Sequence, residues 1–183
     1  MKKFLMTIAA AFVAVSMSAQ NEMYVGGTLN FQSKQGTIDT RMTIAPEFGV
    51  KLSEDWGVGA IINYTNTKYL SSAKDNSFRF EPYARYYAFN IGKVNVFVDG
   101  RAYFQTTTNE PAAGSKTTDN SFGLKVVPGI AYNLTDNISI VAHANPVFNF
   151  DVVSPDGGDT GINVNFLQKF NVNTFNFGFY YNF

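Results

Sequence analysis

Apolar and polar side chains alternate along most of the chain between Met42 and Phe150. In the run that begins at Trp56, the even positions up to Tyr64 are apolar, whereas the odd positions hold Gly, Asn, Thr and one Ile. Apolar residues return at even positions in the runs 78–88, 94–104, 122–132 and 138–150. Because successive side chains of a β-strand point to opposite sides of a sheet, this period of two predicts strands with one apolar face and one polar face.

The ionisable residues of these runs share the odd face. Nine of them carry the prediction of a polar lumen: Glu47, Lys51, Arg79, Glu81, Arg85, Asp99, Arg101, Lys125 and His143. Buried charges persist only when they are paired and hydrogen-bonded, and the interior of an eight-stranded barrel is filled by side chains. We therefore expect an ion-pair network that closes the lumen. A path for ions or small solutes along the same residues is the alternative.

The connections between these runs alternate in length, which predicts an up-and-down antiparallel sheet. Those at 53–55, 90–93 and 135–137 are short and rich in turn-forming residues, whereas those at 33–40, 66–76, 107–120 and 151–161 are longer and polar. The predicted strands are 23–32, 41–52, 56–65, 77–89, 94–106, 121–134, 138–150 and a last strand that ends at Phe183. Eight such strands of about ten residues or more are typical of an all-β, transmembrane β-barrel.

Two features fit this pattern less simply. Apolar residues occupy odd positions in the segment 175–183 but even positions in 162–166. A bulge near 167–170 would join both pieces into one strand, and a small extracellular hairpin is the alternative. Four prolines also fall inside predicted strands, where bulges would compensate for the missing backbone donor: Pro46, Pro82, Pro128 and Pro146.

The distribution of aromatic side chains favours a barrel in a bilayer over a soluble barrel with an apolar core. Trp56 and Tyr64 flank smaller residues on the apolar face, and Phe122 and Tyr132 do the same on a later strand. Rings at both ends of an apolar band about 25 Å tall are expected at the two membrane interfaces. The predicted girdle consists of Trp56, Tyr64, Phe104, Phe122, Tyr132 and Tyr181.

Composition adds a targeting segment and excludes several classes of function. Lys2 and Lys3 precede an apolar run and then small residues, which predicts a cleaved signal peptide at 1–19 and a barrel domain at 20–183. Removal of the two lysines leaves 12 basic residues against 14 acidic ones, a net charge of −2, and there is no cysteine. We therefore expect no nucleic-acid partner, no thiolate metal site and no cysteine-linked lipid anchor.

The complete alternating pattern and the terminal segment Gly178-Phe179-Tyr180-Tyr181-Asn182-Phe183 resemble those of a known family. The chain is similar to the small outer-membrane β-barrel proteins of Gram-negative bacteria typified by outer membrane proteins A and X, and to single-domain members of the Bacteroidota type. The resemblance implies the outer membrane as location and its lipid as surroundings. It also implies that Phe183 belongs to a signal read by the barrel-assembly machinery. It carries over no wall-binding role, and we expect a monomer.

Candidate chemistry is sparse. His143 lies four positions from Ser139 on the same face, and some barrels of this size are lipid A-modifying acyl enzymes that use such residues. Asp151, Asp156 and Asp159 could offer oxygens to Ca²⁺, but they lack the spacing of a known calcium loop, and a glycine turn is the better explanation. We expect no catalytic site, cofactor or metal. The predicted function is a structural or surface-interaction role through the extracellular loops, whose ligand the sequence does not identify, with an outer-leaflet lipid enzyme or a narrow channel as alternatives.

Overall fold

The computed structural model describes residues 22–155, 157–166 and 176–183, so the predicted signal peptide lies outside the described residues. These residues form only strands, turns and bends, and they include no helix able to cross a membrane. The strands are β1 (Met23–Gln35), β2 (Ile38–Lys51), β3 (Trp56–Tyr69), β4 (Lys74–Ile91), β5 (Val94–Glu110), β6 (Thr117–Asn133), β7 (Ile138–His143), β8 (Phe148–Ser154), β9 (Gly161–Phe166) and β10 (Asn176–Asn182).

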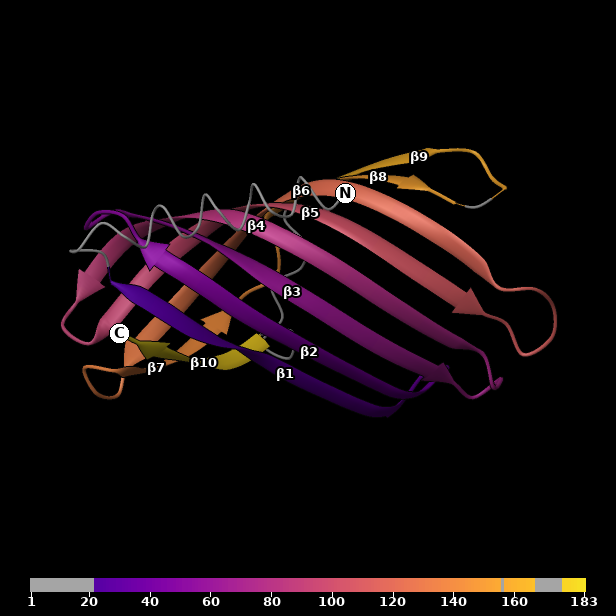
Figure 1. Cartoon of the computed structure of the whole chain (residues 1–183), viewed down its shortest axis with the longest axis horizontal. Coiled ribbons are helices and arrows are strands. Elements are labelled where there is room, and N and C mark those ends of the chain that lie inside the picture. The colour runs from indigo at the N-terminus through magenta and orange to yellow at the C-terminus, as the bar shows by residue number, and fades with distance from the viewer. Residues whose placement is uncertain (1–21, 156, 167–175) are drawn as a thin grey trace.

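Eight of these strands close into a ring of antiparallel pairs, as the sequence predicts. Each strand from β1 to β6 pairs with the next, β7 pairs with β10, and β10 returns to β1. The closing ladder runs from Tyr24 opposite Asn182 to Thr28 opposite Gly178. The strands run obliquely along an elongated barrel (Figure 1). Over the length of this closing ladder the described sheet has no edge, which is the condition for a sheet to lie in lipid.

The prediction of one strand over 138–150 is wrong, because β7 and β8 divide that segment. β7 lies opposite the inner end of β6, and β8 lies opposite the outer half of the same strand. On β6, Gly129 pairs with His143 and Val126 pairs with Phe148. The chain advances five residues from His143 to Phe148 but only three residues between their partners on β6, so the register shifts by two residues. Pro146, which cannot donate a ladder hydrogen bond, lies in this interruption. An even shift leaves the inner and outer faces unchanged.

β9 lies in the ambiguous segment near the C-terminus. It forms a hairpin with β8, with Phe166 opposite Phe148 and Ile162 opposite Val152. Among the described residues β9 pairs with β8 alone, and Figure 1 shows this hairpin projecting from the β6 side of the barrel. A small hairpin and a last strand joined to β10 by a bulge would both place 161–166 opposite β8, so this ladder fits either alternative. The predicted bulge at 167–170 lies outside the described residues.

The connections at one end of the barrel are shorter than the sequence suggests. β1 and β2 extend until only Gly36 and Thr37 separate them, and four residues, 70–73, separate β3 from β4. Residues 111–116 and 155–160 form the other two connections, although residue 156 is outside the described part. Most of the segments predicted as polar loops are therefore paired strands. Their polar residues on both faces hide the alternation that reveals a strand within the bilayer.

The opposite end holds the three tight turns and the C-terminus (Figure 1). There the Phe183 amide donates to the Met23 carbonyl at 2.8 Å, and the Asn182 amide donates to the Asn137 carbonyl at 2.7 Å. Barrels of this class have short turns on the periplasmic side and longer connections outside the cell. We therefore name the end with the tight turns the inner end, and the end with the four hairpins the outer end.

Aromatic rings form two bands on the outward face. Trp56 packs against Tyr86 near the inner end, and Phe104 packs against Phe122 near the outer end, each with ring centroids 5.1 Å apart. From Trp56 to Tyr64 the strand advances about 26 Å, or about 20 Å along the barrel axis at a tilt near 40°. These two positions therefore span most of an apolar band about 25 Å tall.

A polar rim follows directly above the outer aromatic band. Asn66 donates to Asn76 at 2.7 Å, and Thr106 donates to Asn120 at 2.9 Å, all on outward-facing positions. Amide and hydroxyl groups tolerate the headgroup region but not hydrocarbon. The rim therefore marks the outer limit of the membrane-spanning part.

The prolines in β2 and β4 do not produce bulges. The β2–β3 ladder omits Pro46, and the β4–β5 ladder omits Pro82, yet each ladder resumes in the same register. The recorded register shifts lie elsewhere, between Ile38 and Thr40 and between Tyr87 and Phe89. A missing donor is accommodated here by the loss of a local pair and not by an inserted residue.

The assignment of the outward face predicts the effect of a new charge on it. Ala60→Arg places a guanidinium near the middle of the apolar band, and we expect it to lower the free energy of unfolding by about 2–4 kcal/mol. Thr118→Arg on the outward face beyond the polar rim serves as the matched control, with an expected cost of about 0–1 kcal/mol. Urea unfolding of protein refolded into lipid vesicles measures both. Equal stability of Ala60→Arg and the wild type would contradict the assignment.

The barrel lumen as the candidate functional site

The structure places all nine predicted lumen residues on the inward face. Six are buried: Glu47, Glu81, Arg85, Asp99, Arg101 and His143. Lys125 is nearly buried, Arg79 is partly exposed toward the outer end, and Lys51 pairs with Glu22 at the inner end. The lumen therefore contains a continuous set of ionic groups.

Arg85 lies at the centre of this set and is 1% exposed. Register brings it directly opposite Asp99, to which its Nε and Nη2 donate at 2.7 and 3.0 Å. Its Nη2 also donates to Glu47 at 3.0 Å and to the Tyr180 hydroxyl at 3.2 Å. Two carboxylates from two other strands thus compensate one fully buried guanidinium.

Four aromatic rings surround the same guanidinium. Its central carbon lies 3.8 Å from the ring centroid of Phe97 and between 5.1 and 5.5 Å from the centroids of Tyr83, Tyr24 and Tyr180. A desolvated cation over an aromatic face gains electrostatic stabilisation that it would not have in water. We call Arg85, Glu47, Asp99 and these four rings the septum.

Hydrogen bonds between hydroxyl groups tie the rings to the carboxylates. The Tyr83 hydroxyl donates to Glu47 at 2.6 Å and lies 2.5 Å from the Tyr24 hydroxyl. The rings of Tyr24 and Tyr180 pack with centroids 4.7 Å apart. Polar atoms at the centre of the septum therefore have partners, as buried polar groups require.

Glycines on neighbouring strands make room for the large lumen rings. Each ring lies opposite a glycine in the ladder: Tyr24 opposite Gly49, Tyr83 opposite Gly59, Phe97 opposite Gly129 and Tyr103 opposite Gly123. A Cβ at any of these glycines would approach the opposing ring to 2.4 Å or less. Glycines on the inward face of the strands could have indicated from the sequence where large lumen rings lie. Which ring faces which glycine is known, however, only once the strand register is known.

A second ionic cluster surrounds Glu81 above the septum. Glu81 Oε1 accepts from Lys125 at 2.9 Å and from Arg79 at 3.2 Å, and Arg101 Nη1 lies 3.6 Å from Oε2. Arg101 also donates to Asp99 at 2.8 Å and so joins this cluster to the septum. Three cations share Glu81, which leaves this part of the lumen with an excess of positive charge.

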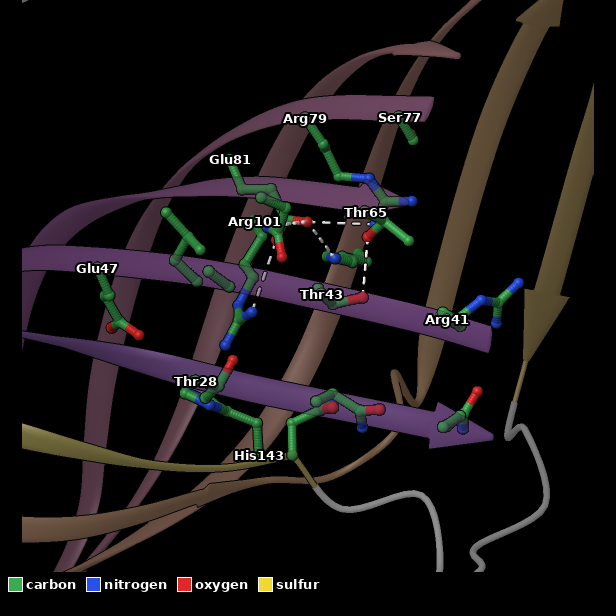
Figure 2. A pocket seen from close by; sticks show the side chains of 17 residues that line it. Thr28, Arg41, Thr43, Glu47, Thr65, Ser77, Arg79, Glu81, Arg101 and His143 are labelled. Carbon is green, nitrogen blue, oxygen red and sulfur yellow. Dashed lines mark hydrogen bonds and ion pairs between the residues drawn. The ribbon is translucent and has the colours of Figure 1, made fainter. Parts of the chain in front are cut away.

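The septum divides the lumen into two cavities. The outer cavity has a volume of about 360 Å³ and is lined by Glu47 and His143 at its floor; Figure 2 shows these residues with the polar groups above them. The inner cavity, of about 390 Å³, is lined by Arg85, Phe97 and Tyr180. Among the described residues, none lines both cavities, so the two are separated by side chains.

The residues considered for catalysis do not form a nucleophile–base pair. Ser139 donates to Asn133 at 2.8 Å, whereas the His143 ring lies edge-on to Phe97 and its Nε2 is 3.6 Å from Asp99. His143 is buried at the septum, out of reach of a membrane lipid. Across the described residues, no group of three or more His, Cys, Asp or Glu could hold a metal ion, and Asp156 of the considered calcium loop lies outside them.

The remaining site residues from the sequence lie on the outer surface. The six predicted girdle residues are exposed: Trp56, Tyr64, Phe104, Phe122, Tyr132 and Tyr181. Phe183 is also exposed, at the inner end. Its role as an assembly signal stays a prediction.

A closed ring of eight strands, apolar outside and ionic within, defines a small transmembrane β-barrel. The profile of the family described as outer membrane protein beta-barrel domain matches residues 5–183, and the chain belongs to this family. It is therefore an outer-membrane β-barrel protein that crosses the membrane with strands. No curated protein sequence matches the chain.

Solved structures support the same fold. The chain is similar to the outer membrane protein OprG from Pseudomonas aeruginosa, with a TM-score of 0.54 and 17% identity over 89% of this chain and 95% of that one. A major outer membrane protein from Thermus thermophilus gives a TM-score of 0.51 at 12% identity, covering 90% and 100%. Neisserial surface protein A gives 0.50 at 15%, covering 89% and 96%. At these identities the likeness shows the fold alone.

Loss of the central cation should destabilise the barrel. Arg85→Met leaves Glu47 and Asp99 buried without their shared partner, and we expect the free energy of unfolding to fall by about 3–5 kcal/mol. The matched control Lys51→Gln breaks an exposed ion pair and should cost at most about 1 kcal/mol. Urea unfolding in lipid vesicles compares the two variants.

A triple variant tests whether unpaired charge is the cause of that loss. Arg85→Met combined with Glu47→Gln and Asp99→Asn removes the three charges of the septum together, so it should recover part of the lost stability, although Arg101 then keeps only Glu81 as an acidic partner among the described residues. The proposed role of Arg85 is wrong if Arg85→Met alone is as stable as the wild type.

Proposed function

We propose that this protein is a non-enzymatic surface component of the outer membrane, which acts through its four outer hairpins while its lumen stays closed to solute flow. The septum carries this proposal. Arg85, Glu47 and Asp99 are buried, fully paired and enclosed by rings, so movement of an ion through the lumen would first have to separate these groups. The surface beyond the membrane is therefore the part of the protein that we propose to be functional.

The outer hairpins are suited to contact with other molecules. The Tyr69 hydroxyl donates to Asp75 at 2.5 Å, Asn109 donates to Asp119 at 2.7 Å, and Lys116 contacts Glu110 at 2.6 Å. The hydrogen bond to Asp75 raises the pKa of Tyr69, and the Lys116 ammonium lowers the pKa of Glu110. These local bonds hold the polar groups beyond the rim in paired strands, so less conformational entropy is lost on binding than with mobile loops.

The lipid-enzyme alternative has less support. Ser139 and His143 are bonded to different partners, and both side chains are buried. We propose accordingly that membrane lipid surrounds the barrel as solvent and not as substrate. We propose further that the barrel-assembly machinery inserts the protein into the membrane and that the protein is a monomer.

A closed lumen predicts an electrically silent protein. Purified wild-type barrel in a planar lipid bilayer should give no steady conductance above that of the protein-free bilayer, because the septum separates the two cavities. Lys51→Gln, which alters the inner end without touching the septum, should be equally silent. Steady single-channel currents from the wild type would overturn the closed-lumen proposal and favour the narrow channel.

A role of the hairpins predicts a loss of attachment when one of them is altered. Residues 111–116 between β5 and β6 are replaced by a Gly-Ser segment of the same length, which keeps the barrel but removes the surface chemistry. Cells that carry this variant should attach several-fold less well to a panel of matrix proteins and polysaccharides, whereas cells with Lys51→Gln should attach like the wild type.

Two outcomes would contradict this role. Unchanged attachment of a deletion strain to every surface in the panel would remove its support. A change in the lipid A mass spectrum on deletion that His143→Ala reproduces would favour the lipid enzyme instead.

A further inference from the structure

The outer cavity is a compartment that the closed-lumen proposal does not use. Its floor is the septum, and its walls come mainly from the inward faces of β1 to β4 (Figure 2). Above the floor the lining is rich in uncharged polar side chains: Thr28, Asn30, Gln32, Thr43, Asn63, Thr65 and Ser77. Hydroxyl and amide groups of this kind can both donate to and accept from a hydroxylated ligand.

The cavity also carries uncompensated positive charge. Four basic side chains line it against two acidic ones, an excess of two positive charges. The basic residues are Arg41, Arg79, Arg101 and Lys125, and the acidic residues are Glu47 and Glu81. Glu47 is paired with Arg85 of the septum and Arg101 with Asp99 of the septum, so these two pairs cancel, and Glu81 is shared by three cations. Charge in a partly desolvated cavity favours the binding of a counterion.

Of the four basic side chains that line the cavity, Arg41 is the least paired. Its Nε donates to the Thr67 hydroxyl at 3.2 Å, and among the described residues no carboxylate forms an ion pair with it. Arg79 uses its Nε on Gln105 and its Nη1 on Glu81, which leaves Nη2 without a recorded hydrogen bond in the described part of the chain. Guanidinium groups bind carboxylates and phosphates in planar, paired geometry.

We propose that the outer cavity binds a small hydroxylated organic anion of the sugar-acid class. The Arg41 and Arg79 guanidinium groups take the carboxylate, and the Thr, Ser, Asn and Gln side chains take the hydroxyl groups. A volume of about 360 Å³ is at the small end of ligand sites and suits about one sugar unit. The septum below holds the ligand in the cavity, so the site serves binding and not passage.

Titration of refolded protein in a neutral polyoxyethylene detergent tests this site. D-glucuronate is the probe, and methyl β-D-glucuronoside stands for the end of an acidic polysaccharide. Both should bind saturably with backbone NMR shifts on β2 and β4, whereas D-glucose, which lacks the carboxylate, should bind about tenfold more weakly or worse. Glucuronoside binding without glucuronate binding would overturn the free sugar acid as ligand.

Matched variants separate the cavity from the barrel surface. Arg41→Gln should weaken glucuronate binding about tenfold, because it removes a charge-assisted contact. Lys68→Gln removes the same charge from the outward face of β3 and should bind like the wild type. Each variant must retain the wild-type β-sheet spectrum.

Three results would overturn the proposal. They are the absence of saturable glucuronate binding, an equal affinity of Arg41→Gln and the wild type, and an affinity for inorganic phosphate equal to that for glucuronate, which would exclude recognition of the hydroxyl groups. The proposal is independent of the hairpins, because attachment by the 111–116 replacement strain and titration of the purified barrel are separate measurements.

Discussion

The need to compensate one buried guanidinium organises the interior of this protein. Arg85 is almost fully buried, so two carboxylates, a tyrosine hydroxyl and four rings replace most of its hydration shell. In the apolar core of a soluble protein, burial of such a group would cost much free energy and is rare. In this barrel the apolar side chains face lipid, so charged side chains occupy the interior. The same requirement closes the lumen and confines the open space to two separate cavities.

The faces and the strand order could be predicted from the sequence because the bilayer imposes a strict rule on each position. A lipid-facing residue must be apolar and its neighbour must point inward, so the period of two continues from Trp56 to Tyr64 and returns in the runs 78–88, 94–104, 122–132 and 138–150. The same rule led to the inward ionic residues, since a charge such as Arg85 or Asp99 has no alternative to the lumen.

The rest depended on information that single strands do not carry. Beyond the polar rim both faces meet water, so pairs such as Asn109 with Asp119 show no alternation, and the sequence pattern predicts loops where the structure has paired strands. The septum depends on which residues stand opposite each other, and the partnership of Phe97 with Gly129 is a property of register. The interruption at Pro146 shifts the register by two residues, so the same positions continue to face outward. The alternation of apolar residues therefore does not indicate that the strand is interrupted there.

The septum draws its members from both ends of the chain. Tyr24 comes from the first strand and Tyr180 from the last, whereas Arg85 comes from the middle. During biogenesis the guanidinium can therefore obtain its final partners only when the terminal strands meet. If β1 and β10 paired two residues out of register, the apolar side chains would still face lipid. Tyr180 would, however, lie farther from Arg85. The septum thus favours the correct register of closure, which the apolar side chains on the outer face cannot distinguish from the shifted one.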